Sequence, residues 1–180
     1  MAIYAYGDFI PKIAPDAWIF PSADIIGNVI IGKGAYIGAG AVIRGDYGEI
    51  IIEDGVAIEE NVTIHAPVNK QCVIHENAII GHAAMLHGCE IFPEAVVGMS
   101  SVVSNDAILG ERSILGEGAV ITANTHIPKE TVALGIPARS VKEAPKHLIR
   151  FWQQAGKIYR QLAIDYPQKL RRLDNPLNIK

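Results

Sequence analysis

Three histidines close together in the sequence are the residues best suited to chemistry. They are His65, His82 and His87. Neutral imidazole nitrogens are common ligands of zinc and other first-row metals. Three protein ligands leave the fourth position of a tetrahedral zinc ion open, as in catalytic zinc sites, whereas structural sites fill all four, often with cysteine. We therefore predict that these histidines bind one catalytic metal ion.

The elements that position these histidines follow from a six-residue repeat. Aliphatic residues occupy every sixth position over long stretches. They are Ile19, Ile25, Ile31, Ile37 and Ile43, then Ile52, Ile58 and Ile64, then Ile74, Ile80 and Leu86, and finally Ile91, Val97, Val103, Leu109, Leu115 and Ile121. Small or β-branched residues, such as Ala23, Val29 and Ala35, follow four positions later. This period fits neither an α-helix nor a long strand and is typical of a parallel β-helix.

We predict an all-β solenoid, a left-handed parallel β-helix of hexapeptide repeats, with a C-terminal α-helix. Three hexads would close one triangular coil of about 18 residues, with the aliphatic residues inside. The domain would span residues 1–142, the helix 143–166 and a polar tail 167–180, and residues 135–139 would end the solenoid. The helix shows an apolar stripe at helical spacing, and we expect this stripe to pack along the β-helix. The stripe consists of Leu148, Phe151, Trp152, Ala155, Ile158, Tyr159 and Leu162.

Counting hexads around the coil places the histidines on two faces of the solenoid. Arg44, His65 and His87 each follow the aliphatic residue of a hexad on one face, so they should stack at the inter-strand spacing of about 4.7–4.9 Å. His82 comes two positions after Ile80, on another face. It should therefore reach the other two histidines only from a neighbouring subunit. The ligand placement thus predicts an oligomer. In a homotrimer, the face of His65 and His87 would meet the face of His82 in the next subunit and place the metal sites at the interfaces.

Other polar residues are expected near the same interface. Glu59 follows Ile58 on the face of His82, one coil below it. Asp46 could pair with an arginine of the adjacent subunit, where losing one partner would be costly. Two insertions interrupt the period, at 44–48 and 66–72. Insertions in a solenoid become loops on one face, often the binding face.

The bulk composition excludes several classes of function. The 180 residues carry a net charge of −3 without a basic stripe, so we expect no nucleic-acid partner. No stretch approaches the roughly 20 apolar residues of a membrane span. No secretory signal begins the sequence, and with only two cysteines this suggests a cytoplasmic protein. We interpret Cys72 as a loop residue and Cys89 as a minor candidate for a fourth ligand.

These residues resemble the γ-class carbonic anhydrase family of the hexapeptide-repeat superfamily, over about residues 10–165. The resemblance rests on Ile43-Arg44-Gly45-Asp46, Ile64-His65, Gly81-His82 and Leu86-His87-Gly88. It implies a trimer with three interfacial zinc sites, or iron or cobalt in place of zinc. It also implies metal ligation by His65, His82 and His87, and an interfacial Arg44–Asp46 pair.

The sequence departs from the family at the neighbouring positions. Glu59-Glu60 stands where members commonly have Gln-Asp, and the loop after His65 is short and lacks a carboxylate. Tyr159 matches a tyrosine that the family brings near the site. The resemblance thus makes Glu59 and Tyr159 candidate catalytic residues. The whole chain looks closest to the branch of phenylacetate-degradation and carnitine-pathway proteins.

Four functions remain open from the sequence, the first three with a small-molecule substrate. The first is hydration of carbon dioxide to bicarbonate by metal-bound hydroxide, with modest activity because the shuttle carboxylates are missing. The second is metal-dependent hydrolysis of an acyl-CoA thioester. The third is a metal-free hexapeptide acyltransferase, which usually needs one catalytic histidine. The fourth is a non-catalytic scaffold.

Overall fold

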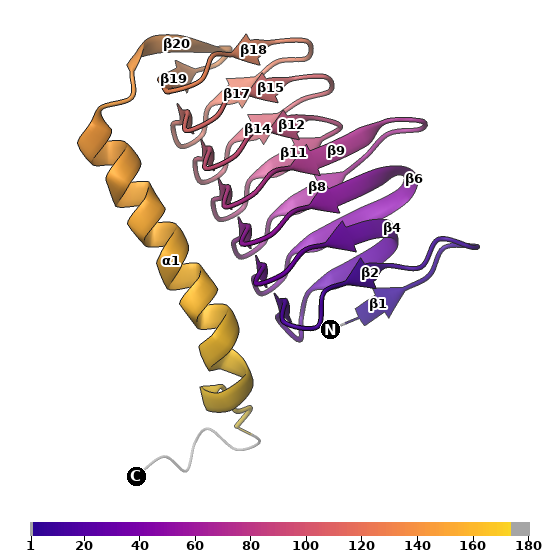
Figure 1. Ribbon diagram of the computed structural model, residues 1–180. Coiled ribbons are helices and arrows are strands. Elements are labelled where there is room, and N and C mark those ends of the chain that lie inside the picture. The colour runs from indigo at the N-terminus through magenta and orange to yellow at the C-terminus, as the bar shows by residue number, and fades with distance from the viewer. Residues whose placement is uncertain (1, 174–180) are drawn as a thin grey trace.

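The computed structural model describes residues 2–173 and forms a stack of parallel coils flanked by one long helix (Figure 1). Strand pairing confirms the predicted left-handed parallel β-helix. One face is an eight-stranded sheet, here called the helix face. Its strands, in spatial order, are β20 (Ala138–Glu143), β19 (Thr131–Gly135), β16 (Ile114–Leu115), β13 (Val96–Val97), β10 (Ile79–Ile80), β7 (Ala57–Ile58), β5 (Tyr36–Ile37) and β3 (Trp18–Ile19).

The other two faces form one twelve-stranded sheet because β6 runs through both of them. The histidine face contains β17 (Val120–Ile121), β14 (Val102–Val103), β11 (Met85–His87), β8 (Thr63–His65) and the start of β6 (Val42–Ile52). The third face contains the end of β6, β9 (Gln71–Ile74), β12 (Glu90–Ile91), β15 (Ile108–Leu109) and β18 (His126–Ile127). Next to β6 lie β4 (Asp24–Ile31), β1 (Ala2–Tyr4) and β2 (Lys12–Ile13).

The hexad repeat explains the core. Every aliphatic residue of the predicted six-residue series is buried. The small residues of the series fill the space beside them, and Ser101 and Ser113, which are also buried, donate their hydroxyl hydrogens to backbone carbonyls. Buried polar groups need such partners. Several corners have the left-handed backbone that asparagine tolerates best, as at Asn61, Asn77 and Asn124.

The first insertion does not form the predicted loop. β6 is continuous from Val42 to Ile52, so residues 44–48 are strand. The extra residues lengthen β6 to 11 residues, and it pairs with the eight-residue β4 through a register shift between Gly27 and Val29. Backbone pairing satisfies the hydrogen-bonding groups that an irregular loop would leave to water. The second insertion does contain a turn, closed by Lys70 N–H donating to Pro67 O at 3.0 Å.

The predicted loop position of Cys72 is wrong. Cys72 lies in β9 and is buried in the core, with its Sγ 3.8 Å from Sγ of Cys89. Both side chains therefore belong to the interior of the solenoid. This placement gives no support to Cys89 as a fourth metal ligand.

The C-terminal helix α1 (Lys146–Lys169) covers the helix face. Leu148, Trp152, Ala155 and Tyr159 pack against the sheet, as the apolar stripe predicts. Phe151 and Ile158 are instead exposed, because they lie on the flank of a stripe wider than the contact. The helix begins at Lys146 rather than 143 and ends at Lys169 rather than 166.

The ends of the solenoid agree with the predicted order of elements. Gly135 and Ala138 bound the connection between β19 and β20, which pair antiparallel and close the stack before α1. Of the predicted tail 167–180, residues 167–169 belong to the helix and residues 174–180 lie outside the described part. Within residues 2–173, α1 lacks the length of apolar sequence that crossing a bilayer requires.

Candidate metal centre

The ladder of β6, β8 and β11 stacks the predicted residues of the histidine face. Arg44 pairs in register with His65, and His65 pairs with His87. The two imidazole rings have centroids 5.0 Å apart, close to the spacing of neighbouring strands. This confirms the predicted stack, because one coil of hexads brings the same corner of the repeat back to the same face.

The hydrogen bonds of the two rings orient two nitrogens toward each other. His65 Nε2 lies 3.0 Å from Asp46 Oδ1, and His87 Nδ1 lies 2.5 Å from Asn105 Oδ1. These oxygens accept hydrogen bonds, so each places the N–H of its neutral histidine on that nitrogen. The other two nitrogens, His65 Nδ1 and His87 Nε2, face each other at 3.0 Å with their lone pairs. Two lone pairs at this distance need a cation or a shared proton between them.

The facing nitrogens fit a metal ion. Tetrahedral zinc with Zn–N bonds of about 2.0–2.1 Å holds two nitrogens roughly 3.3 to 3.4 Å apart. The observed 3.0 Å between His65 and His87 is within a small side-chain adjustment of that value. The far nitrogens donate to a carboxylate and an amide oxygen, which is the outer hydrogen bonding that metal-binding histidines have.

Asp46 is held as a carboxylate by its neighbours. Partial burial opposes its ionisation, but hydrogen bonds from His65 and Arg44 outweigh this effect and lower the pKa of Asp46. Arg44 and Asp46 form an ion pair within the described chain, and a contact of this pair with a neighbouring subunit stays a prediction. The two side chains are only two residues apart on β6, so both point to the same side of the strand.

His82 lies apart from the other two histidines, after β10 on the helix face. Among residues 2–173, no three His, Cys, Asp or Glu side chains meet as a metal site within one chain. The His82 ring is 46% exposed and touches two carboxylates, Glu59 Oε2 at 3.0 Å from Nε2 and Glu60 Oε2 at 2.7 Å from Nδ1. One of these contacts must open before His82 can ligate a metal.

Glu59 and Tyr159 do lie beside His82. Glu59 is only 5% exposed and accepts a hydrogen bond from the backbone N–H of His82 at 3.0 Å. Burial, and then a hydrogen bond to Glu59, raise the pKa of Tyr159 above its usual range. The tyrosine is therefore a neutral donor to a buried carboxylate. These three side chains also line one pocket of about 180 Å³.

Three neighbouring residues were not predicted as site residues. Asn105 lies two positions after Val103, one coil above Leu86, so the hexad count could have found it. Glu60 was noted only as a departure from the family, yet it contacts the ring of His82. Tyr36 donates a hydrogen bond to Glu60 Oε1 at 2.9 Å. No local pattern marks Tyr36, because it reaches Glu60 from the coil below.

Sequence comparison finds relatives over part of the chain. Residues 10–45 match the family described as bacterial transferase hexapeptide (six repeats). A segment of 55 residues is 56% identical to carnitine operon protein CaiE of Proteus sp. (strain LE138) and 53% identical to that of Salmonella newport. The match covers 31% of this chain and 28% of the length of each of these relatives.

Solved structures match nearly the whole chain. A putative acetyltransferase from Bacillus cereus is 30% identical, with a TM-score of 0.90 over 92% of this chain and 96% of the other. A hexapeptide transferase family protein from Anaplasma phagocytophilum is 32% identical, with a TM-score of 0.88 over 92% and 98%. The chain belongs to the hexapeptide transferase family. The CaiE matches support its resemblance to the carnitine-pathway branch.

Proposed function

We propose that this chain is a metal-dependent enzyme of the γ-class carbonic anhydrase type, which hydrates carbon dioxide reversibly. The observation that carries the proposal is the pair of nitrogens, His65 Nδ1 and His87 Nε2, which face each other at 3.0 Å while both far nitrogens are hydrogen-bonded to acceptors. A zinc ion bound there would make hydroxide available from water near neutral pH. Iron or cobalt would suit the same imidazole donors.

The third ligand in this proposal is His82 of a second subunit in a homotrimer. His82 is half-exposed on the helix face, whereas His65 is more buried on the histidine face. Contact between these two faces of neighbouring subunits would complete the site. Because Glu59 and Glu60 touch the two nitrogens of His82, the glutamate opposite the ligating nitrogen would keep the ring oriented.

Glu59 and Tyr159 would act on protons in the same site. Glu59 is a buried carboxylate that accepts hydrogen bonds from Tyr159 and from the His82 backbone. A proton released during hydration could pass to Glu59, and Tyr159 would hold that carboxylate in place. The adjoining pocket of about 180 Å³ is smaller than the roughly 300–1,000 Å³ of drug-sized ligand sites. Its size suits a small substrate.

Metal analysis followed by stopped-flow hydration tests the proposal. The purified protein should hold one zinc, iron or cobalt ion per chain and hydrate carbon dioxide above the buffer rate. His65→Ala and His87→Ala should abolish both, whereas His126→Ala, on the third face, should change neither. A protein loaded with each of these metals that shows no hydration above buffer would contradict the proposed activity.

Acyl-group chemistry is the second candidate, and a comparison favours it. The 30%-identical structure from Bacillus cereus is described as a putative acetyltransferase. Metal-dependent release of CoA from acyl-CoA esters, without acceptor, would indicate a thioesterase. Acetyl transfer that survives complete metal removal would indicate a metal-free acyltransferase, and would then replace the carbonic anhydrase proposal.

A further inference from the structure

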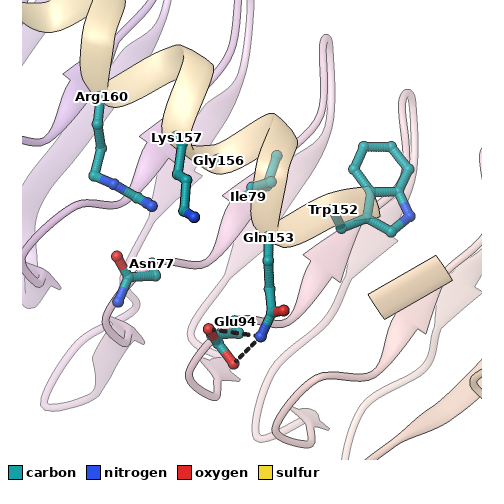
Figure 2. Close-up of a pocket in the computed structure, with 8 residues that line it drawn as sticks. All are labelled: Asn77, Ile79, Glu94, Trp152, Gln153, Gly156, Lys157 and Arg160. Carbon is teal, nitrogen blue, oxygen red and sulfur yellow. Dashed lines mark hydrogen bonds between the residues drawn. The ribbon is translucent and has the colours of Figure 1, made fainter. Parts of the chain in front are cut away.

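A second groove lies between α1 and the corners of the coils, away from the histidine face (Figure 2). Its volume is about 280 Å³. Arg160 and Lys157 enter it from the helix, and Asn77 lines it from the corner after β9. Figure 2 shows the guanidinium group of Arg160 and the amino group of Lys157 both pointing into the space above Asn77. None of these residues belongs to the candidate metal centre.

The two cations of this groove lack acidic partners. Among residues 2–173, Arg160 makes a single long hydrogen bond, from Nη1 to Gly55 O at 3.4 Å, and the exposed Lys157 makes no ion pair. The two side chains are one helical turn apart and converge on one space, where like charges repel. An anion between them would turn this repulsion into two attractive contacts. Arginine and lysine side chains are common phosphate-binding groups in proteins.

The acidic residue of the groove does not neutralise these cations. Glu94 accepts a hydrogen from Gln153 Nε2, which lies 3.1 Å from each carboxylate oxygen, and Arg112 lies 3.9 Å away. Figure 2 shows Glu94 and Gln153 at a separate end of the groove from Arg160. The groove thus has a cationic end and an end with an acceptor. A ligand with an anionic head and a hydroxyl on its body would match both.

A glycine keeps the groove open. Gly156 is buried in the middle of α1, where glycine is less stable than alanine. A Cβ at this position would lie 3.3 Å from Arg160 Nη1 and 3.6 Å from Ile79 Cδ1. A methyl group there would crowd the guanidinium group and fill space beside the apolar wall. The apolar wall itself, Ile79 and Trp152, offers a surface for the body of a ligand.

We propose that this groove binds a small phosphate monoester. Its phosphate would contact Lys157 and Arg160, its body would lie along Ile79 and Trp152, and a hydroxyl would donate to Glu94. The volume of about 280 Å³ lies just below the usual range of roughly 300–1,000 Å³ for ligand pockets, so the ligand is of mononucleotide size or smaller. The proposal does not depend on a metal at the histidines.

Calorimetric titration with 5′-AMP tests this proposal on the full chain. Adenosine, inorganic phosphate and sodium sulfate at matched ionic strength serve as comparison ligands. AMP should bind more tightly than phosphate, and adenosine should bind weakly. Replacing both cations (Lys157→Gln with Arg160→Gln) should weaken AMP binding by about tenfold or more, because two charge-assisted contacts are lost. Gly156→Ala should weaken it as well.

Arg150→Gln is the matched control. It removes one positive charge, against two in the double variant, from an exposed position of the same helix outside this groove, and should leave AMP binding unchanged. Melting temperatures identify variants that fail to fold. Equal AMP affinity in the double variant and the native protein would overturn the proposal, as would no binding up to about 10 mM. Sulfate or phosphate binding as tightly as AMP would overturn the assignment to a monoester.

Discussion

At the scale of residues, the hydrogen-bond acceptor beside each histidine decides which ring nitrogen can bind a metal. Asp46 and Asn105 take the hydrogens of His65 Nε2 and His87 Nδ1, which frees the facing nitrogens to bind a cation. Arg44 in turn keeps Asp46 ionised. The pair of histidines is therefore preorganised for the proposed metal by neighbours that would not contact the ion themselves.

Asp46→Asn should weaken metal binding. The amide lacks the negative charge that Asp46 places behind His65, so His65 becomes a poorer donor. We expect zinc affinity to fall by about tenfold to a hundredfold, measured by competition with a chelator. Asp106→Asn is the control, because it removes an exposed carboxylate that pairs with Lys70. Equal losses in both variants would argue against a specific role for Asp46.

His75 should make stability depend on pH. Burial opposes its protonation, but hydrogen bonds and charges from Glu90 and Glu53 outweigh this and raise the pKa of His75. A raised pKa means that the contribution to stability is complete below the unfolded pKa of about 6.5 and is lost as pH rises through the folded pKa. His75→Gln should thus lower the melting temperature more at pH 6 than at pH 9. The same loss at both pH values would rule out this contribution.

At the scale of elements, the stacking distance of the coils limits which residues the strands can carry. β4 and β6 approach so closely that a Cβ at Gly45 would lie 2.5 Å from Asn28 O, and one at Gly27 would lie 2.4 Å from Gly45 O. Backbone atoms cannot rotate away as a side chain can. Packing of β6 against β4 therefore requires glycine at position 45. The same strand carries Arg44 and Asp46 beside the candidate metal centre.

Gly45→Ala should destabilise the protein by about 3 kcal/mol or more, because the clash is with backbone. Gly118→Ala is the control. Gly118 has a φ of +65° but open space around its Cβ position, so only the cost of the left-handed backbone applies, about 1 to 2 kcal/mol. Urea unfolding of both variants measures the difference. A Gly45 variant no less stable than the Gly118 variant would show that β4 and β6 can separate.

At the scale of the whole molecule, the candidate metal centre is divided between two faces. His65 and His87 lie on the histidine face, whereas Glu59, His82 and Tyr159 lie together on the helix face. One described chain contains no complete three-ligand site. If the proposed trimer forms, each interface would join one half of the site from each of two subunits.

Mixing two inactive variants tests this division. A His82→Ala subunit keeps one half of the site, and a subunit with His65→Ala and His87→Ala keeps the other. Each variant alone should bind no metal. After refolding an equal mixture, three quarters of the trimers are mixed and each has one intact interface, so about a quarter of the sites should return. No recovery in verified mixed trimers would contradict a shared site.

The six-residue period was enough to predict the architecture and the stacking of the candidate ligands. The six-residue period assigns each aliphatic residue to the interior and each hexad to a face, because three hexads return the chain to the same face one coil higher. This is why the sequence alone could place Arg44, His65 and His87 on one ladder and His82 on another face. The assignment of a residue to the interior or to a face therefore depends only on its position within six consecutive residues.

The contacts that break the period could not be predicted, because they depend on how the chain folds. The paths of β6 through the first insertion, of Cys72 into the core and of α1 over the helix face depend on packing between distant segments. The same holds for the oxygens that contact the rings of His82 and His87. They belong to Glu59, Glu60 and Asn105 in other coils. The hexad count places a residue on a face, but the direction of its side chain at a corner depends on neighbours in the coils above and below.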